Sequence, residues 1–223
     1  MTSISEPVRE AVEKVGETIA NSVTHGVGLV ASLIAMPVVI LSAMKENDPL
    51  RVVGATVYGL SLVMLYTAST AYHSFPRSSA TRLLRVLDHS AIYLLIAGSY
   101  TPFALGPLRG PLGWSLLVAV WAIALVGIVL KTRKGFGTKR LTIVAYVAMG
   151  WLSIVALKPL FTALGPTGFT WLLAGGLCYT GGIVFYATDQ RVRYGHAVWH
   201  LFVLAGSACH FFAVLWYSGT PTG

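Results

Sequence analysis

The sequence predicts an all-α membrane protein, built as a seven-transmembrane helix bundle, and three observations lead to this fold class. Apolar residues make up 55% of the 223-residue chain, charged residues make up 11%, and the mean hydropathy is +0.71. An average soluble domain contains roughly 25% charged residues, so a chain of this composition cannot cover a soluble surface. Long apolar stretches recur along the whole sequence, and charged and turn-forming residues gather between them. The same pattern excludes a disordered chain and a small disulfide-stabilised scaffold.

The first 20 residues form a polar and amphipathic segment. Val8, Val12, Val15 and Ile19 recur at three- and four-residue spacing, and charged residues occupy most positions between them. This periodicity is typical of a helix with one apolar face. We expect either a short helix in the membrane interface or a lead-in that packs against the first span. A signal peptide is not expected, because the apolar stretch that follows is longer than the roughly 7 to 15 residues of a cleavable core.

A transmembrane helix requires about 20 mainly apolar residues, and several stretches of the chain meet this requirement. They cover residues 22–44, 52–74, 84–105, 112–130, 141–161, 168–188 and 196–217. The segments between them contain charged residues, Pro or Gly, which are typical of turns. We therefore expect one transmembrane domain over residues 21–217 and a short tail over 218–223, with the two termini on opposite sides of the membrane.

The positive charges predict the orientation, because Lys and Arg in short loops are retained on the cytoplasmic face. Most of the 16 Lys and Arg residues fall on the side that holds the N-terminus, with clusters at 77–85, 131–140 and 191–193. The opposite side has Lys45, Arg51, Arg109 and Lys158. We therefore expect a cytoplasmic N-terminus. The net charge of +8 follows from this distribution and from attraction to anionic lipid, so membrane lipids, and not nucleic acid, are the expected partners.

Ionisable residues inside the spans cost at least about 2.5 kcal/mol each on insertion scales, so each requires a partner or a function. The few that occur are His25, His73, Asp88, His89, His196, His200 and His210. In the topology above, the second span ends near the cytoplasmic face, and the third and seventh spans begin there. The sequence therefore predicts that polar residues from three different helices converge at one depth of the membrane.

The converging residues have the types and spacing of a metal site. His196 and His200 are four residues apart, so their side chains share one helix face with Cβ atoms about 5–6 Å apart. His73 would supply a third imidazole, and three nitrogens around zinc leave a fourth position open for water. Asp88 could hydrogen-bond that water, and Ser69 shares a helix face with His73. Zn²⁺ is the expected cofactor, although iron or copper could use the same ligands.

A structural interpretation of these residues stays open beside the metal site. A His-x-x-x-His pair without the Glu of the metalloprotease motif also occurs as hydrogen-bonded core residues. We expect His25, in a stripe with Glu17 and Asn21, to be structural. His89 points about 100° away from Asp88 on the same helix. His210 lies some 21 Å deeper than His196 at 1.5 Å per residue, so it is expected to pack or to relay protons rather than to bind the same metal.

Four stretches of the sequence together resemble a known family. They are 69–75 (STAYHSF), 87–93 (LDHSAIY) with 97–102 (AGSYTP), 195–200 (GHAVWH), and an opening pattern of Glu17, Asn21, Thr24 and His25. In this order across seven spans they resemble the haemolysin III branch of the progestin and adipoQ receptor family, over nearly the whole chain.

The resemblance implies a multi-pass protein of the bacterial plasma membrane, with seven helices and the N-terminus inside. It also implies a zinc ion near the cytoplasmic face with His73, His196 and His200 as ligands. Asp88 would hold or activate the zinc-bound water, and Ser69 would lie beside it. The related adiponectin receptors and alkaline ceramidases look like lipid amide hydrolases, which implies a ceramide-like lipid amide as the substrate.

Three functions remain open at this point. The first is a zinc-dependent amide hydrolase with Asp88 and Ser69 as catalytic residues. The second is a channel, transporter or cytolytic protein of the haemolysin type, for which the chain of buried ionisable groups up to His210 would serve as a proton path. The third is a receptor-like protein in which zinc is only structural. A rhodopsin is excluded, because the seventh span has no Lys for a Schiff base. The oligomeric state is not predicted.

Overall fold

The computed structural model describes residues 6–76, 78–134 and 139–219, and within them the chain is helical without a strand. The elements are α1 (Glu6–Met44), α2 (Pro49–Ser74), α3 (Thr81–Leu105), α4 (Pro111–Lys134), α5 (Lys139–Gly150), the 3₁₀ segment η1 (Trp151–Ala156), α6 (Leu157–Thr188) and α7 (Gly195–Tyr217). The all-α prediction is confirmed. The start of the expected amphipathic segment (1–5) and most of the expected tail (220–223) lie outside the described residues.

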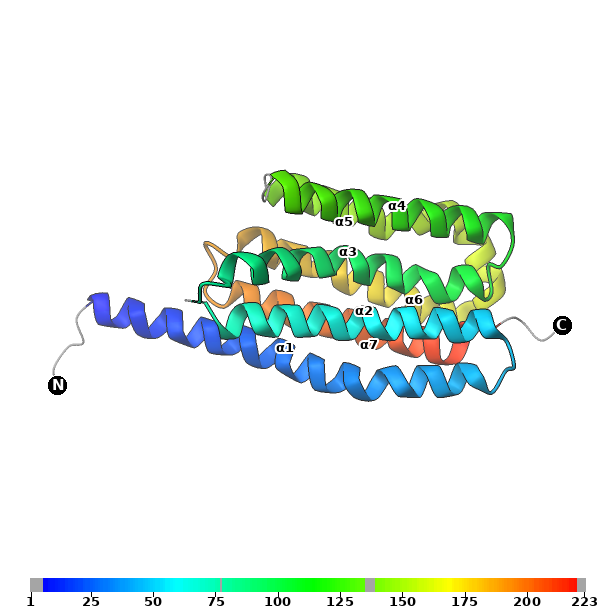
Figure 1. The fold of residues 1–223 in the computed structure, drawn as a ribbon, viewed down its shortest axis with the longest axis horizontal. Coiled ribbons are helices and arrows are strands. Elements are labelled where there is room, and N and C mark those ends of the chain that lie inside the picture. Colours follow the sequence, from blue (N-terminus) through cyan, green and yellow to red (C-terminus); the bar gives the residue numbers. More distant parts are fainter. Residues whose placement is uncertain (1–5, 77, 135–138, 220–223) are drawn as a thin grey trace.

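The helices run alongside one another in a single elongated bundle (Figure 1). α4 and α5 form its outer edge, α3 and α6 lie in the middle, and α1, α2 and α7 form the other edge. α7 packs against both α6 and α1, and α2 packs between α1 and α3. α1 begins at one end of the bundle and α7 ends at the other end.

The outer surface of the bundle is apolar, and several polar side chains lie inside it. Large apolar side chains point outward, with Val118 67%, Ile34 64% and Val184 62% exposed, whereas Ser69 and His200 are each 1% exposed. Apolar surface on this scale is stable when lipid covers it. Among the residues that the structure describes, five helical stretches are long and apolar enough to cross a membrane: Val12–Met44, Pro49–Ser74, Pro111–Arg133, Lys139–Thr188 and Gly195–Tyr217.

The chain departs from the expected boundaries at two places. α1 continues without a break past residue 20, where the amphipathic segment was expected to end. The regular helix expected over 141–161 is interrupted by η1. The turn expected between residues 161 and 168 agrees with the break in helical conformation at Gly165, with φ 66°, inside α6. The Tyr100 hydroxyl donates to the carbonyl oxygens of Met149 and Gly150 at 3.0 and 2.7 Å and accepts from the Ser153 N–H at 2.9 Å. One side chain from α3 therefore satisfies backbone groups that the change from α to 3₁₀ geometry releases.

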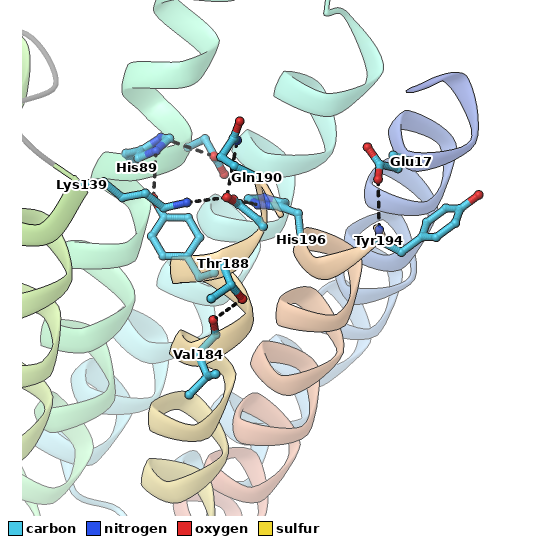
Figure 2. Close-up of polar contacts among 11 residues, drawn as sticks. Glu17, His89, Lys139, Val184, Thr188, Gln190, Tyr194 and His196 are labelled. Atoms are coloured by element: carbon cyan, nitrogen blue, oxygen red, sulfur yellow. Dashed lines mark hydrogen bonds and ion pairs between the residues drawn. The ribbon is translucent and has the colours of Figure 1, made fainter. Parts of the chain in front are cut away.

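The start of α7 is fixed by α1. Tyr194, directly before α7, has a left-handed backbone with φ 57°, which is uncommon for a residue with a side chain. The Glu17 carboxylate accepts a hydrogen bond from the Tyr194 N–H at 3.0 Å (Figure 2). The loop before α7 is thus held against the N-terminal part of α1, and this contact sets the position of the two histidines in the first turns of α7.

Candidate metal centre

Three histidines from two helices meet inside the bundle. One ligand nitrogen from each of His73, His196 and His200 lies within 4.8 Å of the other two. The ring centroids are 5.0 Å apart for His73 and His196, 5.1 Å for His73 and His200, and 4.7 Å for His196 and His200. Zinc–nitrogen bonds of about 2.0–2.1 Å in a tetrahedron place ligand nitrogens about 3.3 Å apart, a separation that small side-chain rotations reach from here. This cluster could hold a metal ion.

The ring orientation of His200 is fixed by α1. Its Nδ1 lies 3.2 Å from the Asn21 carbonyl oxygen and 3.0 Å from Thr24 Oγ1. The Thr24 hydroxyl already donates to the Ala20 carbonyl oxygen at 2.8 Å, so it accepts from His200. Nδ1 therefore carries the ring hydrogen, and the bare lone pair is on Nε2. That is the tautomer that binds a metal ion through Nε2.

The ring of His196 is oriented in the same way by a carboxylate. Asp189 Oδ2 lies 3.1 Å from His196 Nδ1, and Asp189 Oδ1 accepts from Lys139 Nζ at 2.6 Å. Lys139 and His196, both labelled in Figure 2, contact this same carboxylate. Burial acts to raise the pKa of Asp189, but its hydrogen bonds to His196 and Lys139 outweigh this effect and lower the pKa to about 2. Asp189 is therefore charged at neutral pH and holds the His196 Nδ1–H, which leaves Nε2 for a metal ion.

His73 completes the fit to a metal ion. Its Nε2 is buried and has no hydrogen-bond partner in the part of the chain that the structure describes. A buried nitrogen without a partner costs free energy, and coordination removes that cost. His73, His196 and His200 thus form an imidazole set in which two rings are oriented by hydrogen bonds to Nδ1 and the third has a free lone pair, as zinc requires.

Asp88 and Ser69 lie beside the cluster. Both line the same cavity as His196 and His200. Asp88 is 9% and Ser69 1% exposed. A carboxylate at this position can hold or deprotonate a water molecule next to the three histidines, and a hydroxyl can donate a hydrogen bond.

His25, which the sequence suggested as a structural residue, forms a wall of the same site. Its ring stacks on the His200 ring with centroids 3.5 Å apart and 13° between the planes. His25 is 3% exposed, and neither ring nitrogen has a hydrogen-bond partner among the described residues. His89 lies outside the cluster, because its Nδ1 bonds to the Arg85 carbonyl oxygen at 2.8 Å.

Two functional residues escaped the sequence analysis. Asp189 and Lys139 were assigned only to loops between spans, because their contact joins the N-terminus of α5 to the end of α6, 50 positions along the chain. The available signal was weak: an acidic residue seven positions before His196, in a chain that has only eight acidic residues.

A long cavity connects this polar cluster with the middle of the bundle. Side chains of α3, α5, η1, α6 and α7 line it, and away from the histidines they are mostly apolar, among them Leu95, Phe103, Ile154 and Leu172. A site of this shape accepts a molecule with one polar group and a hydrocarbon chain.

The fold and this cluster define a helical membrane protein with a partly buried three-histidine centre at the polar end of an apolar cavity. Residues 14–211 match the model of the haemolysin-III related family. The chain belongs to that family, which is the haemolysin III branch of the progestin and adipoQ receptor family. It is a multi-pass membrane protein.

Curated relatives match along almost the whole chain. Hemolysin-3 of Bacillus cereus is 46% identical over 214 residues, which are 96% of this chain and 97% of the relative. The Hemolysin-3 homolog of Bacillus subtilis is 46% identical over 204 residues, with 90% and 94% covered. The human monocyte to macrophage differentiation factor is 29% identical over 214 residues, with 90% and 84% covered.

Proposed function

We propose that the protein is a zinc-dependent hydrolase that cleaves a lipid amide inside the membrane. The observation that supports this most directly is the fixed Nδ1–H tautomer of both His196 and His200, next to the buried Asp88 in an apolar cavity. Two neighbouring histidines with only a structural function would not both need a hydrogen-free Nε2, whereas two metal ligands do. His73, His196 and His200 would hold the zinc ion.

The chain's own residues divide the reaction among them. A bound zinc ion would supply Lewis acidity and an activated water. Asp88 accepts a proton from the attacking water while the water oxygen forms a bond to the amide carbon. Asp88 then passes this proton to the amide nitrogen as the carbon–nitrogen bond breaks. Ser69 donates a hydrogen bond to the developing oxyanion. The products are a fatty acid and an amine, and the apolar cavity would hold the acyl chain.

Variants of Asp88 and His73 distinguish a loss of catalysis from a loss of metal binding. We expect about one zinc per chain in detergent-purified wild type by elemental analysis, loss of the metal in His73→Ala and His196→Ala, and retained metal with no turnover of a ceramide-like amide in Asp88→Ala. Wild-type protein purified without chelator and free of stoichiometric metal would refute the proposal. Turnover that survives Asp88→Ala would refute the role of Asp88.

The proposal includes seven spans with the N-terminus in the cytoplasm. The stretch Lys139–Thr188 has 50 residues, more than twice the length of one span, and Gly165 breaks it. If this stretch crosses the membrane twice and α3 crosses once, the bundle has seven spans. The Lys and Arg clusters at the end of the bundle where α1 begins support a cytoplasmic N-terminus. Labelling intact cells with a membrane-impermeant maleimide should modify Asn47→Cys and spare Arg191→Cys. The opposite result would invert the topology.

A second candidate function comes from the relatives named Hemolysin-3. A cytolytic protein would release dye from liposomes or haemoglobin from erythrocytes, and it would do so equally well when His73→Ala removes the metal. Release by wild type together with no hydrolysis of any lipid amide would favour this function over the hydrolase.

A further inference from the structure

The inner end of the cavity contains a second polar position, at His210. This residue belongs to α7, is 9% exposed and lines the cavity together with His196 and His200 of the three-histidine cluster. It lies ten positions after His200, which is about 15 Å along the helix at 1.5 Å per residue. His210 is therefore too far from His200 to bind the same metal ion, and its function in the cavity must be a different one.

The hydrogen bond of His210 fixes its tautomer. Nε2 lies 3.2 Å from the Leu172 carbonyl oxygen, which can only accept, so Nε2 carries the ring hydrogen. In the neutral ring Nδ1 is then a bare acceptor. Nδ1 is buried and has no hydrogen-bond partner among residues 6–76, 78–134 and 139–219.

The ring cannot turn away to find another partner. A Cβ atom on Gly175 would lie 2.1 Å from His210 Cδ2, so the ring packs directly on that glycine, and the Tyr179 ring lies against it with centroids 5.3 Å apart. The nearby hydroxyl groups bond to one another and not to His210: Tyr66 donates to Ser207 Oγ at 2.8 Å, and the Tyr179 hydroxyl lies 2.9 Å from Ser207 Oγ. Nδ1 therefore remains an acceptor for a donor that enters from the cavity.

The cavity is open between His210 and the three-histidine cluster. Gly176, one residue after Gly175, lines the cavity, and a Cβ atom on it would meet nothing within 4 Å. The side chains of Leu172, Tyr179 and Val203 line the walls between the two ends. A hydrocarbon chain that starts at the cluster can follow this path to His210.

We propose that His210 forms a subsite for a hydroxyl group on the hydrocarbon chain of a lipid, with Nδ1 as the acceptor. Carbon–carbon bonds of about 1.5 Å in an extended zigzag cover about 15 Å in about twelve bonds. The preferred ligand therefore has its hydroxyl near carbon 12, counted from a carbonyl group held at the cluster. This assignment rests on the proposed function for the place of the carbonyl group, but ligand binding tests it without turnover.

Three acids of equal length test the subsite on the wild-type protein. Displacement of radiolabelled stearic acid should show that 12-hydroxystearic acid binds about three- to tenfold more tightly than stearic acid and 5-hydroxystearic acid, the ratio that one net hydrogen bond gives. Equal affinity of the three acids would overturn the proposal and leave Nδ1 to a water molecule. This comparison requires no variant and is therefore independent of any effect on folding.

Two variants locate the effect. His210→Phe keeps a ring against Gly175 and should remove the preference, so that the three acids bind this variant with equal affinity. Gly176→Leu should weaken all three acids, because its side chain fills the path. A preference that persists in His210→Phe would overturn the proposal. Loss of turnover with the preference retained would refute only the hydrolase function, and turnover without any preference would refute only the subsite.

Discussion

Replacement of Asp189 tests the metal centre without changing a ligand. Its carboxylate holds the Nδ1–H of His196 at 3.1 Å, and the Asp189 side chain is 8% exposed. Asp189→Ala removes a charge-assisted hydrogen bond from a ligand, and the ring of His196 is then free to rotate and to change tautomer. We expect zinc to bind more weakly and the bundle to stay folded, because the Lys139 side chain is 36% exposed and water can solvate its released charge.

The magnitude follows from two independent estimates. Hydrogen bonds to charged groups contribute about 1.5–3 kcal/mol, and loss of an outer-shell partner costs about 10- to 100-fold in metal affinity, which is about 1.4–2.7 kcal/mol. We therefore expect the Kd for zinc to rise about 10- to 100-fold in Asp189→Ala. Asp189→Asn, which keeps a neutral acceptor, should lie between Asp189→Ala and wild type, and Asp189→Glu should recover part of the affinity.

The assay is competition for zinc with a chromophoric chelator in detergent solution, combined with thermal unfolding to check the fold. Glu13→Gln is the matched control, since the Glu13 carboxylate lies 3.4 Å from Arg193, which belongs to the same loop before α7 as Asp189. An affinity of folded Asp189→Ala within twofold of wild type would refute the reasoning, and so would an equal loss in Glu13→Gln.

Two further predictions concern stability. Gly176→Ala should stabilise α6 by about 0.5–1 kcal/mol, because a new Cβ meets nothing within 4 Å. Gly175→Ala should destabilise α6 by about 1–3 kcal/mol, because the new Cβ lies 2.1 Å from the His210 ring. Thermal unfolding of both variants measures these opposite shifts in stability, and equal shifts would contradict the prediction. The hydrogen bond from Arg109 lowers the pKa of Asp48, so the charged carboxylate stabilises the fold above its unfolded pKa of about 3.9, and this contribution is lost as the pH falls through the folded pKa. Asp48→Asn, which keeps an N-cap side chain, should therefore lower Tm at pH 6 and have progressively less effect below pH 4, and a constant difference down to pH 3 would contradict the assignment.

The parts of the fold that local chemistry determines could be predicted from the sequence. A turn was expected between the spans 22–44 and 52–74, and in the structure α2 begins there, with the Asp48 side chain accepting from the Leu50 N–H at 3.0 Å. The break in the fifth expected span could not be predicted, because the Tyr100 hydroxyl that satisfies its backbone comes from α3. A contact between distant segments leaves no mark in the local hydrophobic pattern.

The candidate site also has a part that the sequence predicts and a part that it does not. The spacing of His196 and His200 and the expected depth of His73 are properties of single helices and of the topology, so the sequence alone indicated that they converge. The tautomer of each ring depends on a neighbour from another element, Asn21 and Thr24 for His200 and Asp189 for His196. These partners are ordinary polar residues in the sequence, and only the packed bundle gives them their function.

The candidate metal centre depends on the packing of several elements of the bundle. The ligands come from α2 and α7, but α1 fixes His200 through Thr24 and Asn21, and α5 fixes Asp189 through Lys139. The nitrogens are therefore positioned only after these four elements and the loop before α7 have packed together. A metal ion that binds only the packed state stabilises it by mass action, in proportion to the logarithm of its concentration over Kd. Zinc would then hold together helices that are far apart in the sequence, and a change in α1 or α5 that leaves all three ligands intact would still weaken metal binding.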